Sequence, residues 1–522
     1  MSDPPILKIT SPKRALVQGE AGQITVTGTV APNAVTGETV EKVMINNVQA
    51  TLNADGSFSA DVTIGEGATQ IHTVARDAAG GEATDTRAVL AGELRAPGSN
   101  IDKAITAAIS AEAFGKIAGA AGTIIKGLDI NAMIQPMNPV HHAGDADGED
   151  CLFDRVYVDD FSLTDAKITL VPAQGALNFS VEISGLDVPG HARFAVSCAN
   201  GEKNWRVTAD KILVSAELNI TAKGMDGFDT KLLNPNVQFT NLKIQADGIP
   251  SSITNALRGA IETVVEKAAE MAMNPVMNKA LGGLSGPQTI DILGKSLTMQ
   301  VEPSAIEFDP AGGLVTLDTS MLIEGSEGSQ GFVYTPNGVP NMNPNGGFQL
   351  GLADDLLNEM MSQFNAIGML NLAQPTEGGS FDSTAMSMAL PPVVSADPVD
   401  GKLSVIIGDM TATFTNHGTP VGKAAVNVKL DFQVLPAANG YGVAIKLGQP
   451  EINVDVIDDI TNQTRFSNKD LARAVEVSLA NQLEAISKLL TSIPLPQIAG
   501  LQMKDLSVGS DAGYVMVNGK FE

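Results

Sequence analysis

The sequence has few aromatic, charged and cysteine residues. Aromatic side chains account for 4 % of the 522 residues, and charged side chains account for 18 %, less than the quarter that is usual in globular proteins. The chain has 33 basic and 59 acidic residues, which gives a formal net charge of −26. Binding to nucleic acid or to an anionic lipid surface through charge requires clusters of Lys and Arg, and the sequence contains none. We therefore expect a folded, rather apolar protein that has no nucleic acid partner.

The residue patterns of common enzymes are also missing. The five histidines form no His-x-x-x-His pair and have no cysteine at zinc-binding spacing. The sequence contains no nucleophile elbow, phosphate loop or dinucleotide fingerprint. We therefore expect no enzymatic activity and no cofactor. Neighbouring acids such as Asp354 and Asp355 could act as acid and base, but in so acidic a chain we interpret them as solvated charges at loops and helix ends.

An acidic segment at residues 141–150 is a candidate for a bound cation. Asp145, Asp147 and Asp150 lie close together beside glycines and could donate oxygen ligands to calcium. Their spacing differs from that of an EF-hand loop, and a flexible acidic loop is the alternative that we favour. We therefore predict no metal site.

Long hydrophobic runs and a leader sequence are absent as well. No uninterrupted apolar run reaches 18 residues, so we expect no transmembrane helix. Residues 1–5 lack the charged segment and apolar core that mark a secretory signal, and a leader that had been removed would leave no trace.

Residues 6–92 have the pattern of a small all-β module. Short strand-like runs at residues 24–30, 43–45, 58–64 and 71–75 are separated by turn signals such as Ala54-Asp55-Gly56-Ser57. This spacing predicts a β-sandwich. The segment resembles bacterial immunoglobulin-like domains, which implies a spacer without a ligand of its own.

The rest of the chain alternates between helical and strand patterns. Apolar residues at steps of three or four predict helices at about 101–126, 251–274, 352–367 and from 467 onward. Clean period-two alternation predicts strands that have one dry and one wet face, most clearly at 177–184, 207–221 and 426–434. The order of helix, strands and helix therefore occurs twice in tandem.

Three features of the sequence carry a family resemblance. They are the end "IPLPQIAGLQMKDLSVGSDAGYVMVNGKFE", the stretch "GGFQLGLADDLLNEMMSQFNAIGMLNL" at residues 346–372, and the spacing of Cys151 and Cys198. Together they resemble the bactericidal/permeability-increasing protein family of the tubular lipid-binding superfamily, over residues 99–522.

The resemblance implies an α+β fold. We expect the N-terminal β-sandwich to be followed by two tandem elongated barrels of bent antiparallel sheet wrapped on long helices, joined by a central sheet into a boomerang-like shape. The implied domains are the sandwich at 6–92, a first lipid-binding barrel at 99–287, a central sheet and connector at 288–345, and a second barrel at 346–522 whose final strands return to the central sheet.

The resemblance also implies binding or transfer of lipids without catalysis. An empty apolar tunnel would cost about 24 cal/mol per Å³, and a bound hydrocarbon chain would remove this cost. The expected ligands are phospholipids or other molecules with acyl chains, and the acidity of the chain makes endotoxin neutralisation doubtful. The residues expected to contact acyl chains are Ile105, Ile109, Ile117, Ile261, Val265, Leu356, Met360, Phe364, Leu479, Leu483 and Ile486.

Further expectations follow from the resemblance. It implies a disulfide between Cys151 and Cys198, and hence a periplasmic, cell-surface or secreted protein near a bacterial membrane or surface. The alternative function is an interaction scaffold with no lipid cavity, because apolar stripes of this kind also form ordinary packed cores.

Overall fold

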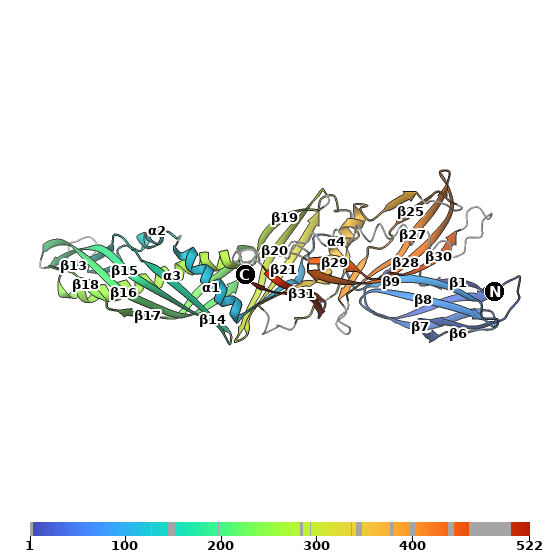
Figure 1. The fold of residues 1–522 in the computed structure, drawn as a ribbon, viewed down its shortest axis with the longest axis horizontal. Coiled ribbons are helices and arrows are strands. Elements are labelled where there is room, and N and C mark those ends of the chain that lie inside the picture. Colours follow the sequence, from blue (N-terminus) through green and yellow to red (C-terminus); the bar gives the residue numbers. More distant parts are fainter. Residues whose placement is uncertain are drawn as a thin grey trace.

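The computed structural model is an elongated molecule with the N-terminal module at one end (Figure 1). The last strands of the chain lie near the middle of its length (Figure 1). The residues that the structure describes are 4–126, 128–144, 152–196, 198–281, 285–292, 294–335, 337–340, 347–375, 381–396, 403–436, 443–458, 475 and 503–521.

The expected fold class is wrong, because the described residues are dominated by strands. They form 32 strands and four α-helices, and only one of the helices is long. The sheets in this part of the chain are open. In the seven-stranded sheet of the first half, for example, the hydrogen-bonded order runs from β12 to β17 without a pairing that joins these two edges. The structure therefore consists of bent open sheets and not of barrels wrapped on long helices.

Residues 6–91 form two sheets around a separate apolar core. The strand orders are β1-β3-β7-β6 and β2-β9-β8-β4-β5, and the core between them includes Val26, Ile45 and Ile71. The strands of both sheets pair only with other strands of this segment, so the segment is a separate module. The bounds are β1 (Ile6–Ser11), β2 (Leu16–Gln18), β3 (Gly22–Ala31), β4 (Val40–Ile45), β5 (Val48–Gln49), β6 (Thr51–Leu52), β7 (Ser57–Ile64), β8 (Gly67–Asp77) and β9 (Glu82–Ala91).

The first half contains a strongly bent sheet built on one long hairpin. β15 (21 residues) and β16 (24 residues) pair antiparallel, and buried residues alternate with less buried ones along β15. This confirms the period-two prediction for residues 177–184. The strands are β12 (His141–Gly144), β13 (Leu152–Val158), β14 (Asp165–Ala173), β15 (Ala176–Val196), β16 (Ala199–Ala222), β17 (Phe228–Thr240) and β18 (Lys243–Gln245).

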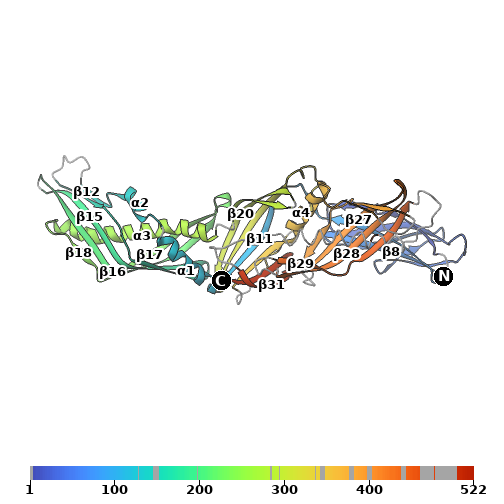
Figure 2. The ribbon, with the colours of Figure 1, turned by 45° about the horizontal axis from the view of Figure 1, so that its top comes forward.

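Three helices cover this sheet. They are α1 (Ala111–Lys126), α2 (Ile130–Ile134) and α3 (Ser251–Leu281). α3 has 31 residues, about 46 Å at 1.5 Å per residue, and lies lengthwise along the sheet (Figure 2). It contacts β12, β13, β16 and β17, and its residues Ile253, Leu257, Ile261 and Val264 are buried. The amphipathic pattern of this segment therefore gives the start and the buried face of the helix correctly, but the helix continues past Pro275 to Leu281, seven residues beyond the predicted end at 274.

The helix expected at residues 101–126 begins ten residues later than predicted. Ile101–Ser110 is strand β11, and only Ala111–Lys126 is helical. β11 pairs along both edges, with β21 and β23, and its residues from Ala104 onward are all buried, so both faces of the strand are covered. A strand buried on both faces reads as a continuous apolar run, which periodicity cannot distinguish from a buried helix.

The central sheet combines strands from distant parts of the chain. Its order is β19-β20-β21-β11-β23-β32-β31, and β32 pairs with both β23 and β31. The strands are β11 (Ile101–Ser110), β19 (Gly286–Ile292), β20 (Lys295–Asp309), β21 (Gly312–Ile323), β23 (Phe348–Ala353), β31 (Met503–Asp511) and β32 (Tyr514–Phe521). A short pair, β10 (Glu93–Arg95) with β22 (Phe332–Tyr334), lies beside it.

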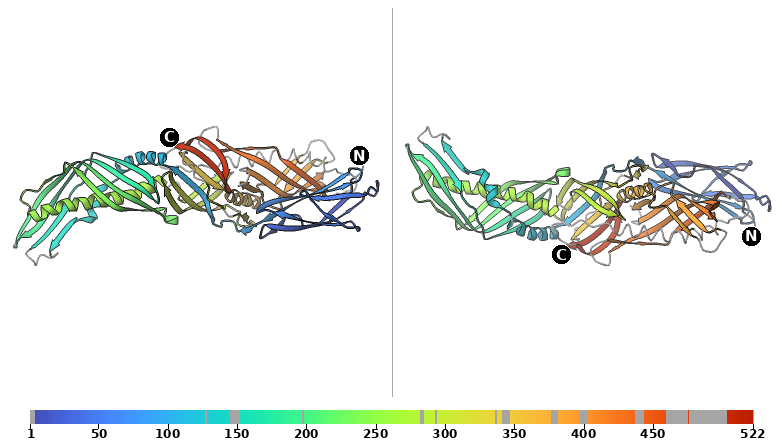
Figure 3. Two further views of the ribbon diagram at one scale, coloured as in Figure 1. Left: turned by 90° about the horizontal axis from the view of Figure 1, so that it is seen from below. Right: turned by 90° about the horizontal axis from the view of Figure 1, so that it is seen from above.

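The second half consists of another bent sheet and one shorter helix. Helix α4 (Asp354–Ala366) follows β23 directly, and the module lies beside the sheet (Figures 1 and 3). β9 of the module contacts β27, β28 and β30. The strands are β24 (Leu372–Pro375), β25 (Ser383–Ser387), β26 (Val393–Ala396), β27 (Leu403–Asn416), β28 (Thr419–Pro436), β29 (Val443–Leu447) and β30 (Glu451–Asp458).

Candidate functional site

The expected lipid-contact residues of the first half are buried, but they lie on different kinds of element. Ile117 is on α1, and Ile261 and Val265 are on α3, each about 1 % exposed. Ile105 and Ile109 are on strand β11 of the central sheet and not on a helix that faces the first-half sheet. All five residues belong to one continuous apolar core.

An apolar crevice lies between α3 and the concave face of the first-half sheet. Its volume is about 30 Å³. Val265 is the only one of the expected contact residues of the described chain that lines it, and the rest of the α3 wall consists of small alanines. The lining residues are Ile130, Phe161, Leu163, Ala166, Phe179, Val181, Ile183, Val265, Ala268, Ala269 and Ala272. The crevice is therefore apolar throughout, but it has only about the volume of one water molecule.

The short helix α2 borders this crevice through Ile130. Asp129 caps it by accepting a hydrogen bond from the Ala132 amide at 2.9 Å. The Asn131 side chain ties it to the sheet side, since its amide donates to Asp160 at 2.6 Å and its carbonyl accepts from the Phe161 amide at 2.7 Å. α2 also buries Ile134 in the core, but a five-residue helix with one buried side chain can shift more easily than the 31-residue helix opposite.

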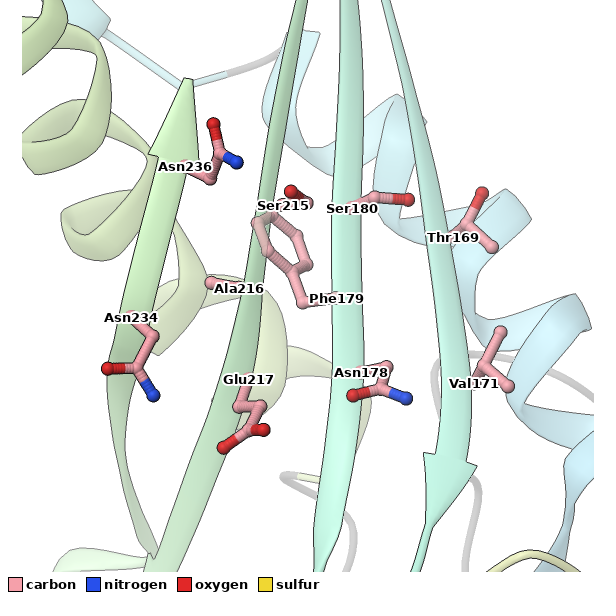
Figure 4. A pocket seen from close by; sticks show the side chains of 10 residues that line it. All are labelled: Thr169, Val171, Asn178, Phe179, Ser180, Ser215, Ala216, Glu217, Asn234 and Asn236. Carbon is pink, nitrogen blue, oxygen red and sulfur yellow. The ribbon is translucent and has the colours of Figure 1, made fainter. Parts of the chain in front are cut away.

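The outer face of the same sheet carries an open polar groove of about 440 Å³ (Figure 4). Thr169, Ser180, Ser215 and Asn236 lie opposite one another on four adjacent strands. Figure 4 shows the side chains of the groove, and Phe179 borders both this groove and the apolar crevice. The groove offers hydroxyl and amide groups and no reactive constellation.

The expected lipid-contact residues of the second half lie on α4 or outside the described residues. Leu356, Met360 and Phe364 are buried, at 7 %, 4 % and 0 % exposed, and belong to the main core. Leu479, Leu483 and Ile486 lie outside the described residues. The apolar side of α4 therefore packs into the core.

The polar side of α4 is buried too, which the sequence analysis missed. Asp355, Glu359 and Gln363 are each 0 % exposed, and Asp354 is 5 % exposed. The interpretation of Asp354 and Asp355 as solvated charges is therefore wrong. The available signal was that the helix contains three acids and no Lys or Arg that could pair with them.

The buried polar side chains fasten four chain segments to α4. Asp354 accepts from the Ala396 amide at 2.9 Å, and Asp355 accepts from the Thr335 amide at 3.1 Å. Glu359 accepts from the Gly98 amide at 2.7 Å. Gln363 accepts from the Ile323 amide at 2.6 Å and donates to the Met321 carbonyl at 2.9 Å. α4 thus joins the segment before β11, the central sheet, the connector after β22 and strand β26.

Burial changes the acidity of these carboxyl groups. It raises the pKa of Glu359 to about 8, that of Asp354 to about 7 and that of Asp355 to about 6. Hydrogen bonds from backbone amides oppose the shift in each case, but desolvation of the charged form is the larger effect.

A second buried polar cluster holds the module against the second half. Asp409 accepts from Arg14 Nη1 at 2.9 Å, from the Ala15 amide at 2.7 Å and from the Ala88 amide at 3.1 Å. Asp455 accepts from the Thr86 amide at 2.8 Å. Asp409 has a positive φ of 46° at an irregularity in β27, which directs its side chain toward the module.

Several expectations concern residues that the structure does not describe. Asp145, Asp147, Asp150 and Cys151 lie outside the described residues, so the calcium alternative and the disulfide to Cys198 stay predictions. Among the described residues, no group of three or more His, Cys, Asp or Glu side chains could hold a metal ion. In the same part of the chain, no helix has both the length and the apolarity needed to span a membrane.

Comparisons with known proteins give one family match and several distant structural likenesses. The family model described as glucodextranase, domain B, matches residues 5–92, which is well under half of the chain. No curated protein sequence matches significantly.

Solved structures that are similar to the chain include a lipopolysaccharide-binding protein and P47 of Clostridium botulinum E1. The first is 13 % identical, covers 81 % of this chain and 99 % of its own, and has a TM-score of 0.38. The second is 9 % identical, covers 81 % of this chain and 100 % of its own, and has a TM-score of 0.30. At these scores the likenesses define neither the fold nor the function, and the site must be judged from its own geometry.

Proposed function

We propose that the protein binds lipids or other ligands with hydrocarbon chains, without catalysing a reaction. The observation that carries this proposal is the apolar crevice between α3 and the first-half sheet. Its lining offers no hydrogen-bonding side chain, so the ligand group that it suits is a hydrocarbon. Each methylene group transferred from water into such a site contributes about 0.8 kcal/mol.

The crevice must widen to hold such a ligand. Sites for small molecules usually measure about 300 to 1,000 Å³, roughly ten times the volume of the crevice or more. The alanines of α3 form a wall of small side chains on one side of the crevice, and α2 borders the crevice on another side. We infer that displacement of α2 from the sheet opens the space, because α3 is fixed along its length by buried apolar residues.

Native mass spectrometry of protein purified without detergent tests the proposal. We expect additional mass corresponding to bound lipid, and the same result after incubation with phosphatidylcholine vesicles. An Ala269→Leu variant should bind less lipid, because the larger side chain fills the crevice. The matched control is Thr263→Leu, which adds a similar apolar side chain on the exposed face of the same helix and should leave binding unchanged.

Two outcomes would contradict the proposal. One is the bare polypeptide mass under all of these conditions, which would favour the alternative of an interaction scaffold. The other is equal lipid binding by wild type, Ala269→Leu and Thr263→Leu, which would place the lipid elsewhere.

A further inference from the structure

Helix α4 connects several chain segments through the carboxylic acid side chains on its polar side. Asp354, Asp355 and Glu359 each accept a hydrogen bond from a backbone amide of a different segment. Polar residues on the same helix make further ties: Asn358 exchanges hydrogen bonds with Val394, and Ser362 donates to the Gly331 carbonyl at 2.5 Å. The relative position of the halves therefore depends on a helix that has three acids in a dry environment.

The carboxyl group of Asp354 accepts one hydrogen bond, from the Ala396 amide, and its buried Oδ1 atom has no partner among the described residues; that of Glu359 is only slightly better compensated. The Glu359 Oε1 atom accepts from the Gly98 amide at 2.7 Å and from Gln363 Nε2 at 3.2 Å. Its Oε2 atom is buried and has no hydrogen-bond partner among the described residues. An ionised carboxylate with a bare buried oxygen costs much more than a neutral carboxyl group in the same place.

The surroundings of α4 offer little compensating positive charge. The titratable groups on the strands packed against it are Tyr334 on β22, Asp318 on β21, and Asp102 and Lys103 on β11. Glu93, Arg95 and Tyr514 lie on strands next to these.

Arg95 is the cation that favours the ionised form of Asp355. Its guanidinium group already contacts Glu93 at 3.3 Å and the Asn100 carbonyl at 2.9 Å, and it lies over the Tyr334 ring. Lys103 is exposed, and its backbone amide bonds Asp318. The acids on the neighbouring strands would only add repulsion.

We propose that α4 is a proton-dependent clasp, which holds the segment before β11, the central sheet and the second half together while its carboxyl groups are neutral and loosens as they ionise. Asp354 and Glu359, which each have a buried carboxylate oxygen without a hydrogen-bond partner among the described residues, dominate the response. The direction agrees with the raised pKa values of all three acids. Because all three pKa values are raised in the closed state, the clasp is tightest below about pH 4, where the acids are neutral in the open state as well, and it weakens progressively up to about pH 8.

Hydrogen exchange of the full-length protein, read by mass spectrometry at several pH values, tests this inference. After correction for the intrinsic pH dependence of exchange, protection of α4 and of residues 321–335 should fall between about pH 5 and 8, by about tenfold per pH unit for each carboxyl group that is neutral in the closed state and ionised in the open state. Glu359→Gln should remove the dependence between about pH 7 and 8, where Glu359 is the one of the three acids that is still neutral in the closed state, because the amide keeps the size of the side chain and cannot ionise. Glu112→Gln, at an exposed acid on α1, is the matched control and should behave as wild type.

The wild-type profile alone can overturn the proposal. Constant protection of α4 from pH 5 to 8 would do so, and so would an unchanged slope between pH 7 and 8 in Glu359→Gln. If Glu359→Gln does not fold, Asp354→Asn and the wild-type profile still decide the question. Lipid content is not measured in this experiment, so its outcome is independent of the proposed function.

Discussion

Replacing Asp409 by Ala should release the N-terminal module from the second half. The Asp409 side chain is 1 % exposed and bridges the two parts of the chain through Arg14 and two backbone amides, those of Ala15 and Ala88. No other carboxylate among the described residues binds either of these amides. Truncation to Ala therefore removes the acceptor of both amides at once.

The expected cost follows from these contacts. Removing one partner of a buried ion pair typically costs about 3 to 5 kcal/mol, and leaving a buried backbone donor without an acceptor costs about 1 to 3 kcal/mol. Arg14 keeps its contacts to Asp85 at 2.9 Å and to Asp455 at 3.6 Å, so its charge stays partly compensated. We therefore expect the contact between module and second half to lose about 3 to 5 kcal/mol in total. This corresponds to at least a hundredfold more frequent local opening.

Amide hydrogen exchange in the intact chain measures this opening. The amides of Ala15 and Ala88 should exchange at least a hundredfold faster in Asp409→Ala than in wild type. Asp409→Asn separates the effect of charge from that of shape, because Asn tolerates the positive φ at this position and keeps one acceptor. The exchange rates of the Ala15 and Ala88 amides in Asp409→Asn should lie between those of wild type and those of Asp409→Ala.

Asp61→Ala is the control for loss of a carboxylate. Asp61 accepts one exposed hydrogen bond from Thr25 within the module, and its removal should change exchange at Ala15 and Ala88 by less than threefold. The reasoning is refuted if Asp409→Ala and Asp61→Ala give the same exchange rates at these two amides. In that case, the apolar contacts of the interface would hold the module alone.

Three further predictions can be checked by solution measurements. Burial raises the pKa of Asp455 to about 7, so its carboxyl group lowers the free energy of unfolding as pH rises from about 4 to 7. Asp455→Asn should remove about 1.4 kcal/mol per pH unit of this dependence, measured by urea titration at several pH values. Parallel plots of unfolding free energy against pH for wild type and Asp455→Asn would contradict the burial argument. If Cys198 forms the predicted disulfide, denatured unreduced wild type should show no thiol by Ellman's reagent and Cys198→Ser should show one; two thiols in wild type would exclude the bridge. A Cβ atom at Gly190 would clash with the Trp205 ring, so Gly190→Val should lower the thermal midpoint by several degrees, whereas Gly259→Ala, with open space around it, should not.

The sequence predicts those parts of the fold in which one face is wet and one is dry. The alternation of apolar and polar residues along β15 and the apolar stripe of α3 can be recognised in the sequence, because each element has a solvent-exposed side. β11 and α4 have no such side. A strand buried on both faces has no alternation, and a helix whose polar residues are buried looks amphipathic while its polar face meets protein instead of water.

The candidate site shows the same limit. Val265 was found because it belongs to a helical stripe, and Ala268, Ala269 and Ala272 follow the same helical period, but small side chains were not counted as contact residues, and Phe161 on a loop carries no periodic signal. The contact between Arg14 and Asp409 joins residues 395 positions apart. Local patterns contain no information on which distant segments meet, so this contact could not be predicted from one sequence.

The central sheet has a consequence for biosynthesis. Its strand β11 begins at residue 101, but its partner β23 stays an unpaired edge until β32, which ends at residue 521, has left the ribosome. The module and the long hairpin of the first half consist of neighbouring segments and can form during translation, whereas the middle of the molecule waits for almost the whole polypeptide. In a nascent chain of this protein, one edge of the apolar strand β23 would therefore stay exposed while the residues between β23 and β32 are synthesised, which makes this sheet a step at which a chaperone would be needed.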